Sequence, residues 1–354
     1  MPFLFSPTIR REDNAYFAAM NTPKGFISEF EPLFSPYRRY IIKGGPGTGK
    51  STLMKKIAKE ATMRGHAVDY YYCSSDTDSL DAIVIPKLSF AMLDGTAPHI
   101  TEPSLVGIKD RYLDLAQFLT PETLREKERI ATLGKKKQEA YQKAYRLLSA
   151  SFSADLALSP LRQDAFDEEK CKKTLARLIE RLQLKTENIP SQKNIPISAL
   201  GSAGYVALDS YKNQAKTQIT VSDRYGVAPL VFDLLKGLLE QNEISYHYSL
   251  SPLTLAIDTI YLPQKRVLIS SLPFSDTPAI TINCERFLLG RGQGLYKGQK
   301  AILAAEKSLV LEAMASLTEA SIAHREIEHH YIAAMNFASL NTYTGALIRE
   351  IFPS

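Results

Sequence analysis

The sequence predicts an α/β protein made of two tandem parallel-sheet domains, each followed by a helical segment. Three observations support this fold class. An apolar strand runs directly into a glycine-rich loop and a helix, the chain resembles itself at a spacing of 177 residues, and a stretch with apolar residues at helical intervals follows each similar part. A chain of 354 residues is long enough for two domains of ordinary size.

The glycine-rich loop is the strongest functional signal. Residues 39–43 (RYIIK) are typical of a short buried strand, residues 44–52 (GGPGTGKST) follow, and apolar residues then recur at helical spacing. Glycines let successive backbone N–H groups face a polyphosphate, and the start of the helix adds its positive dipole end. Lys50 is expected to reach the β- and γ-phosphates, and the Ser51 hydroxyl to hold Mg²⁺. The expected nucleotide-binding residues are Gly44, Gly45, Pro46, Gly47, Thr48, Gly49, Lys50, Ser51 and Thr52.

At residues 44–52 the chain resembles the P-loop NTPases, because the motif GxxxxGK[ST] stands between a strand and a helix. The resemblance implies a nucleoside triphosphate together with Mg²⁺. The sequence has no NKxD motif of the kind that selects guanine, which favours ATP over GTP. The alternative is a glycine-rich turn that only opens a helix.

A carboxylate is expected beside this loop. Residues 67–73 are predicted to form a second strand, residues 79–85 a short helix that ends at Pro86, and residues 88–94 a buried strand ending in Asp94. A carboxylate at that edge of the sheet can bind Mg²⁺, so Asp94 is a catalytic and metal-binding candidate. Only 44 residues separate Lys50 from Asp94, so the strand before the loop (39–43) and the strand that ends in Asp94 should be neighbours in the sheet.

The two nucleotide-site signals point to different branches of the P-loop proteins. The short spacing between Lys50 and Asp94 is similar to that of kinases and GTPases. The loop sequence GGPGTGKST is instead similar to that of RecA, KaiC or AAA ATPases. Asp94 also has a second interpretation, as a turn former before Gly95.

Asp76 is the candidate catalytic base or water-orienting residue. With Asp78 it follows the second predicted strand, where P-loop kinases hold the base that deprotonates an acceptor hydroxyl. The segment SSDTDS can instead cap the helix predicted after it. His99, in the loop after Asp94, could sense the γ-phosphate or belong to a turn.

The second half repeats the first without its chemistry. Residues 42–86 align with residues 219–263 without a gap and share ten identities in 45 positions, where about three are expected by chance. Val227 and Ala228 stand at the positions of Lys50 and Ser51, and Ser271 stands opposite Asp94. This half is therefore expected to be a catalytically inactive copy.

The helical segments complete the organisation. After the second half, apolar residues and His324 recur every seven residues, which predicts long antiparallel helices that pack on each other. The expected units are an active α/β domain (1–106), a basic helical segment (107–185), a linker (186–200), a degenerate α/β domain (201–290) and a C-terminal helical segment (291–354).

This layout resembles a bacterial family of tandem P-loop ATPases with one intact and one degenerate half. The resemblance spans nearly the whole chain and rests on residues 22–25, 44–52, 94–99, 324–331 and 335–337. It implies a fold and nucleotide binding rather than a particular reaction.

Composition and charge indicate the expected compartment and a candidate partner surface. The three cysteines lack CxxC spacing, no apolar run reaches the length of a membrane span, and the first residues are too short and acidic for a signal peptide, so we expect a cytoplasmic protein with no membrane contact. The net charge of +5 lies entirely in residues 107–185, which hold 17 Lys+Arg and 12 Asp+Glu. This basic segment is a candidate surface for a protein partner or a polyanion, and nucleic acid is a weaker alternative.

The leading functional hypothesis is a slow Mg²⁺-dependent ATPase that couples hydrolysis to movement of its helical segments. A small-molecule or nucleoside kinase is the first alternative, favoured by the Lys50–Asp94 spacing and by Asp76 and Asp78. A scaffold gated by a bound nucleotide without turnover is the second.

Overall fold

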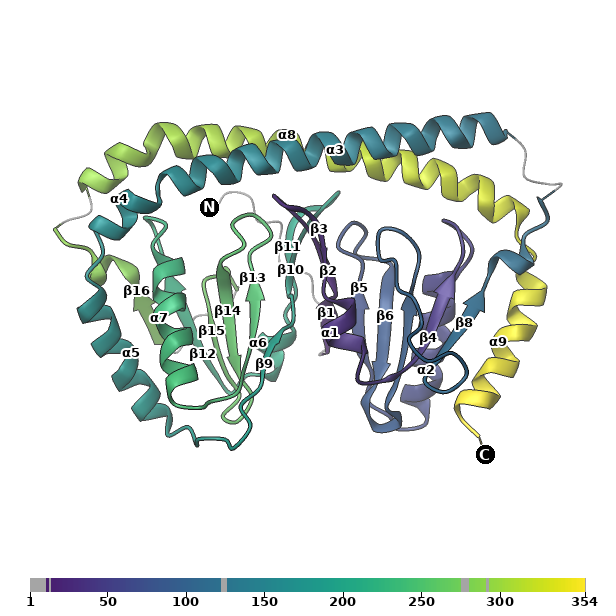
Figure 1. Cartoon of the computed structure of the whole chain (residues 1–354), viewed down its shortest axis with the longest axis horizontal. Helices are drawn as coiled ribbons and strands as arrows, with labels where there is room; N and C mark the ends of the chain where they lie inside the picture. Colours follow the sequence, from purple (N-terminus) through teal and green to yellow (C-terminus); the bar gives the residue numbers. More distant parts are fainter. Residues whose placement is uncertain (1–10, 13, 122–125, 275–279, 291–292, 354) are drawn as a thin grey trace.

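The structure is a computed structural model that describes residues 11–12, 14–121, 126–274, 280–290 and 293–353. The described residues form two α/β halves side by side, with a pair of long helices lying across both (Figure 1).

The first half is built on a six-stranded mixed sheet. Its strands, in spatial order, are β1 (Ala15–Phe17), β5 (Asp69–Tyr72), β6 (Leu80–Ile85), β7 (Phe90–Asp94), β4 (Arg38–Lys43) and β8 (Asp110–Asp114). Neighbours are parallel except at β6, which is antiparallel to both β5 and β7. Helix α2 (Lys50–Met63) packs on this sheet through its buried apolar face, made by Leu53, Met54, Ile57, Ala58 and Ala61.

The predicted helix at 79–85 is wrong, because this segment is strand β6. All six of its residues are buried, and its run of Ile83, Val84 and Ile85 is β-branched, which favours a fully buried strand. The expectation of purely parallel sheets is corrected for the same reason. Pro86 does end the segment, at the start of the short 3₁₀ helix η1 (Pro86–Leu88).

The second half has the same plan. Its sheet contains, in spatial order, β16 (Ile280–Asn283), β12 (Thr217–Ser222), β15 (Val267–Ser270), β14 (Ile257–Leu262), β13 (Tyr246–Leu250) and β9 (Gln192–Asn194). Only β14 is antiparallel to its neighbours, as β6 is in the first half. Helix α7 (Ala228–Gln241) lies where α2 lies in the first half.

Two hairpins and two short helices join the halves. They are β2 (Ala19–Thr22) with β3 (Gly25–Ser28), β10 (Ser198–Gly201) with β11 (Gly204–Ala207), α1 (Phe30–Phe34) and α6 (Ser210–Gln214). Asn21 donates from Nδ2 to the Leu200 carbonyl at 2.8 Å, and one apolar cluster runs through both halves. The segment 186–200, expected as a linker, thus contains strand β9 and the start of β10.

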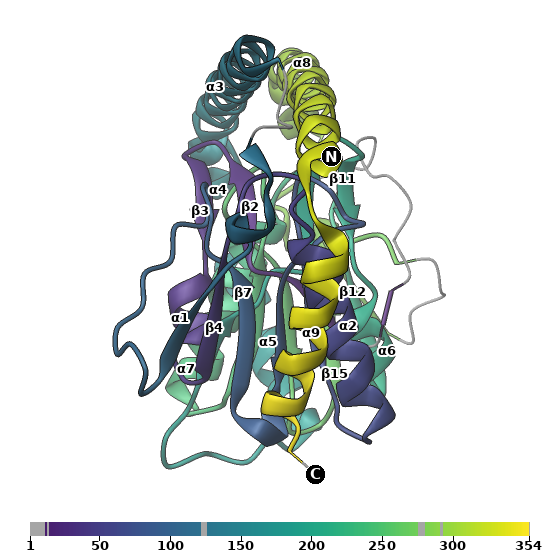
Figure 2. The same ribbon diagram turned by 90° about the vertical axis from the view of Figure 1, so that its right-hand side faces the viewer.

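The long helices are α3 (Lys127–Ala157) and α8 (Gln293–Ala334), which pack on each other. Leu133 of α3 meets Ala323 and Ile327 of α8, and Leu148 lies in the cluster that holds Val310, so the pair is antiparallel. Figure 2, a view close to the axis of the pair, shows both helices above the sheets. The heptad pattern therefore predicted their packing correctly.

Each long helix carries the chain over to the opposite half. Helix α3 leads through α4 (Ser159–Asp164) to α5 (Glu168–Leu182), which packs on α7, and α8 leads to α9 (Phe337–Ile351), which packs on α2 (Figure 1). An equivalent hydrogen bond ties the chain to the opposite half after each crossing, at the last residue of the 3₁₀ helix η2 (Ala116–Phe118) or η4 (Cys284–Phe287). The Asn336 N–H donates to the Phe118 carbonyl at 2.8 Å, and the Asp167 N–H donates to the Phe287 carbonyl at 2.7 Å.

Among the helices that the structure describes, none combines the length and the apolar character that crossing a membrane requires.

Candidate functional site

The glycine-rich loop joins β4 to α2 at the end of the first sheet. Gly47 (φ +72°) and Gly49 (φ +89°) adopt the left-handed conformation that side chains disfavour, and Gly49 caps the N-terminus of α2. Thr48 is fully buried and donates from its hydroxyl to the Gly45 carbonyl at 2.8 Å. The loop is therefore a tight turn with a fixed internal bond.

Lys50 folds back into this loop. Its Nζ donates to the carbonyls of Gly44 and Gly45, at 2.9 Å each, and lies 3.5 Å from Oδ2 of Asp94. The ammonium group thus stands between the loop and the carboxylate that ends β7.

Asp94 lies beside the loop because β7 is the neighbour of β4, with Asp94 paired to Ile42. This confirms the predicted adjacency of the two strands. The Thr96 N–H and hydroxyl donate to Oδ1 of Asp94, at 2.9 and 2.5 Å, which leaves Oδ2 facing Lys50. Burial raises the pKa of Asp94, while Lys50 and Thr96 oppose that rise.

Ser51 lies next to Lys50 at the start of α2, and its hydroxyl oxygen accepts a hydrogen bond from the Leu80 N–H at 2.9 Å. A carboxylate and a hydroxyl are oxygen ligands of the kind that Mg²⁺ prefers. Across the described part of the chain, no group of three or more His, Cys, Asp or Glu side chains could hold a metal ion.

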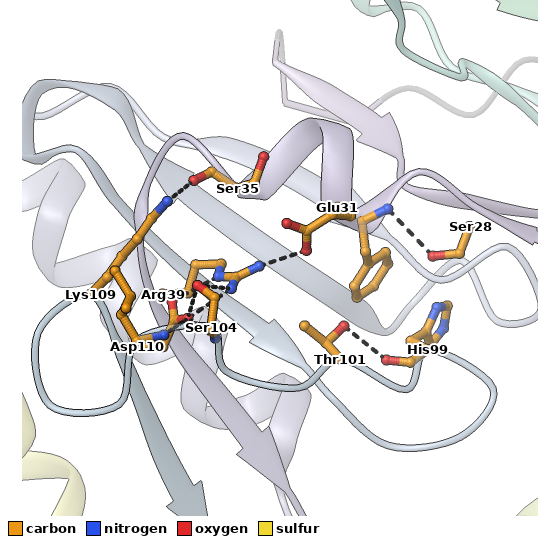
Figure 3. A network of polar contacts seen from close by, with 11 residues as sticks. Ser28, Glu31, Ser35, Arg39, His99, Thr101, Ser104, Lys109 and Asp110 are labelled. Atoms are coloured by element: carbon orange, nitrogen blue, oxygen red, sulfur yellow. Dashed lines mark hydrogen bonds and ion pairs between the residues drawn. The ribbon is translucent and has the colours of Figure 1, made fainter.

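A second buried carboxylate lies near Asp94, and the sequence reasoning gave it no role. Because β6 is antiparallel to β7 and Ala82 pairs with Leu93, Asp81 lies close to Asp94, and its charge contributes to the raised pKa of Asp94. Its Oδ2 lies 3.1 Å from Nε2 of His99, and the imidazole stacks on Phe30 at 4.6 Å between ring centroids. Figure 3 shows His99 next to Thr101, whose hydroxyl donates to the His99 carbonyl at 3.1 Å. Burial lowers the pKa of His99, but Asp81 and Asp94 together raise it more.

One sequence signal could have found Asp81. It is one of the ten positions that are identical in the two halves, where it matches Asp258. Asp258 is also buried, at the same place in β14, so both halves keep a carboxylate inside the sheet.

Asp76 is placed away from this cluster. It is exposed and accepts hydrogen bonds from the Asp78 N–H at 3.2 Å and from the Ser79 hydroxyl at 2.7 Å. Since strand β6 follows rather than a helix, these bonds shape a turn and not a helix cap. The structure does not bring Asp76 into contact with Lys50 or Asp94 in the interactions that it describes, and its catalytic role stays a prediction.

The C-terminal helices lie against the glycine-rich loop. A β-carbon added to Gly45 would lie 3.0 Å from the Tyr331 ring, and one added to Gly47 would lie 2.7 Å from the Glu328 carbonyl oxygen. A β-carbon on Gly49 would lie 3.1 Å from Leu340. The loop thus needs its glycines to accommodate α8 and α9 as well as to turn.

In the second half, the carboxylate of Asp223 in the loop before α7 accepts hydrogen bonds from the backbone N–H groups at the start of that helix. Asp223 accepts hydrogen bonds from the backbone N–H groups of Tyr225 and Gly226 at 3.0 Å and of Ala228 at 2.7 Å. The Arg162 guanidinium lies 2.7 Å from where a β-carbon on Gly226 would stand. These N–H groups are already bonded to an internal anion, which agrees with the loss of the lysine and the hydroxyl.

The buried Asp258 makes the stability of the second half depend on pH. Its Oδ2 accepts from the Ser198 hydroxyl at 3.1 Å, and burial raises its pKa to about 7 against several opposing hydrogen bonds. The folded carboxyl therefore binds a proton more tightly than the unfolded one, whose pKa is about 3.9. Its contribution to stability is fully present below about pH 4 and is lost as the pH rises through about 7.

Asp258→Asn should remove this pH dependence, because the amide resembles the protonated acid. Urea unfolding should show the variant about 1–3 kcal/mol more stable than the wild type at pH 8 and near equal at pH 4. The exposed Asp164→Asn serves as the control and should match the wild type at both pH values. Equal stability of Asp258→Asn and the wild type at pH 8 would show that Asp258 is ionised without cost.

Comparison with known proteins gives one partial match. The family model of the nephrocystin 3 N-terminal region matches residues 34–88, which cover β4, the glycine-rich loop, α2, β5 and β6. No curated protein and no solved structure matches the chain significantly. The matched residues thus contain the strand–loop–helix unit and the two strands that follow it.

Proposed function

We propose that the first half binds Mg²⁺·ATP at the glycine-rich loop and hydrolyses it slowly, and that the second half is a catalytically inactive copy. The observation that carries this proposal is the meeting of Lys50 and Asp94, 3.5 Å apart, at the end of the strand that feeds the loop. A lysine at the start of a helix and a carboxylate at the end of the neighbouring strand are the groups that a nucleoside triphosphate and its metal ion require.

In this proposal the backbone N–H groups of the loop and Lys50 bind the phosphates. Ser51 and Asp94 would hold the Mg²⁺, whose chemistry is to neutralise charge on the phosphate oxygens. Lys50 would exchange its bonds to the Gly44 and Gly45 carbonyls for phosphate oxygens when nucleotide binds. Asp81 and His99 contact each other close to Asp94 and would help to hold the Asp94 carboxylate in position.

The contacts of α8 and α9 with the loop support coupling to the helical segments. Glycines 45, 47 and 49 each face a residue of these helices, so a change in the loop must be accommodated by them. Since α8 also crosses to the second half, its displacement would be transmitted along the length of the protein.

The test is a thermal-shift panel of nucleotides with Mg²⁺. For the wild type, ATP at about 100 times its Kd should add about 2.7 kcal/mol of stability and raise the Tm by several degrees. Lys50→Ala should abolish that rise, whereas Lys59→Ala, an exposed lysine on the same helix, should keep it. A full ATP-induced shift in Lys50→Ala would refute nucleotide binding at this loop.

Turnover is tested separately by phosphate release. Slow release from Mg²⁺·ATP without an acceptor, abolished by Lys50→Ala, is the expected result. Release that needs a metabolite acceptor would instead indicate a kinase, and tight binding without release would indicate a nucleotide-gated scaffold.

A further inference from the structure

Three polar side chains of the long helices form a chain of contacts above the glycine-rich loop. Nζ of Lys137 on α3 lies 3.4 Å from Nδ1 of His324 on α8, and Nε2 of His324 lies 3.6 Å from Oε1 of Glu328, one helical turn further on. All three side chains are partly buried. A lysine, a histidine and a carboxylate thus stand in a row at the end of the helix pair that covers the loop.

This row is in electrostatic contact with the loop. The pKa of Glu328 is lowered first by His324, and also by Lys50 and by the backbone N–H of Gly47. Burial lowers the pKa of Lys137, and the charge of Lys50 lowers it further, while Glu328 opposes the shift. The Glu328 carboxylate therefore contacts His324 directly and lies within electrostatic range of Lys50 on α2 and of Lys137 on α3.

The backbone fixes this geometry. The Glu328 carbonyl oxygen would lie only 2.7 Å from a β-carbon on Gly47, so this turn of α8 rests on the loop itself. A phosphate bound by the loop and Lys50 would lie near the Glu328 carboxylate, because this turn of α8 rests on Gly47. Two anions in one site repel each other, so one of them must withdraw or be weakened.

We propose that Lys137 is a second phosphate-binding cation, supplied by α3, and that Glu328 is an internal anion that takes the place of phosphate in the nucleotide-free protein. This inference rests on the proposed function of the loop. It makes the long helices part of the nucleotide site, since the polyphosphate would draw Lys137 inward and displace Glu328 together with its turn of α8.

The proposal predicts effects of opposite sign for two neighbouring charges. Lys137→Gln should weaken binding of Mg²⁺·ATP by about tenfold, because a charge-assisted contact is lost. Glu328→Gln should strengthen it by about three- to tenfold, because the competing anion is removed. Damage to packing would move both affinities in the same direction, so the opposite signs distinguish a charge effect from a structural one.

The control variants come from the same helices. Lys136→Gln removes an exposed lysine next to Lys137, and Glu326→Gln removes a half-exposed glutamate whose carboxylate lies 3.7 Å from Arg129. Both should bind Mg²⁺·ATP with the affinity of the wild type, measured by titration calorimetry on the full chain.

A second measurement needs no nucleotide. In the ligand-free protein, Glu328→Gln should increase amide hydrogen exchange in residues 44–49 about tenfold, and Glu326→Gln should leave it unchanged. If the wild type binds Mg²⁺·ATP but both charge variants have equal or like-signed affinities and unchanged exchange, the role of Lys137 and Glu328 is overturned while the proposed function stands. If no variant and no wild type binds nucleotide, the proposed function fails, and this inference fails with it.

Discussion

Arg39→Met should lower the free energy of unfolding by about 3–5 kcal/mol, because it leaves a buried carboxylate without its partner. Arg39 is 1% exposed, and its guanidinium donates to both oxygens of Asp110, at 2.8 and 2.7 Å. It also donates to Glu31 at 2.8 Å (Figure 3). These bonds join β4, β8 and α1 in the first half.

The remaining partners cannot replace Arg39. The Ser104 N–H donates to Asp110 at 2.6 Å and its hydroxyl at 2.9 Å, but neither supplies a positive charge. Hydrogen bonds from Arg39 hold the pKa of Asp110 well below its usual range, so the carboxylate is ionised at neutral pH. In the variant it must stay charged inside the protein or take up a proton, and both cost stability.

Urea unfolding of the full chain measures this effect. The adjacent Arg38→Met is the matched control, since Arg38 is exposed and its guanidinium lies 5.5 Å from the Tyr40 ring centroid. It should lose less than about 1 kcal/mol. The double variant Arg39→Met with Asp110→Leu should recover most of the lost stability, because no buried charge is then unpaired. If Arg39→Met loses no more than Arg38→Met, the pair is not the stabilising contact that the geometry indicates.

The sequence predicted the parts of this molecule that depend on local pattern. The glycine-rich loop, its flanking strand and helix, and the adjacency of Asp94 follow from a motif and a short spacing, and the structure has them where they were expected. The packing of α3 on α8 follows from a heptad period. Each of these features is encoded within a few dozen consecutive residues.

The features that sequence reasoning missed depend on contacts between distant segments. A six-residue apolar run such as 80–85 has no periodicity that separates helix from strand. The sequence therefore did not predict that this segment is a strand antiparallel to β7, nor that Asp81 lies close to Asp94. The pairing of Arg39 with Asp110 joins residues 71 apart. The heptad pattern also does not show on which half the helices after α3 and α8 pack. That placement depends on contacts between distant segments, such as the hydrogen bond from the Asn336 N–H to the Phe118 carbonyl.

Asp94→Asn should reduce the rate of phosphate release by at least about 100-fold, the largest effect on turnover that the proposed function predicts for a near-isosteric change. The amide keeps an oxygen that can accept from the Thr96 N–H and hydroxyl, so the end of β7 should be preserved. What is lost is the negative charge that faces Lys50 and would hold Mg²⁺. A metal-binding role therefore predicts a higher Mg²⁺ concentration for half-maximal rate, along with the lower rate.

Asp76→Asn is the decisive companion to this variant, since it makes the same chemical change at the other predicted catalytic carboxylate. The exposed turn that holds Asp76 leads us to expect a rate within about twofold of the wild type and an unchanged Mg²⁺ dependence. A large loss in Asp76→Asn with little change in Asp94→Asn would reverse the assignment and place the reacting phosphate beside the turn at 76–79. Equal losses in both would require that turn to close over the loop during turnover, because only such a movement brings Asp76 to the phosphates.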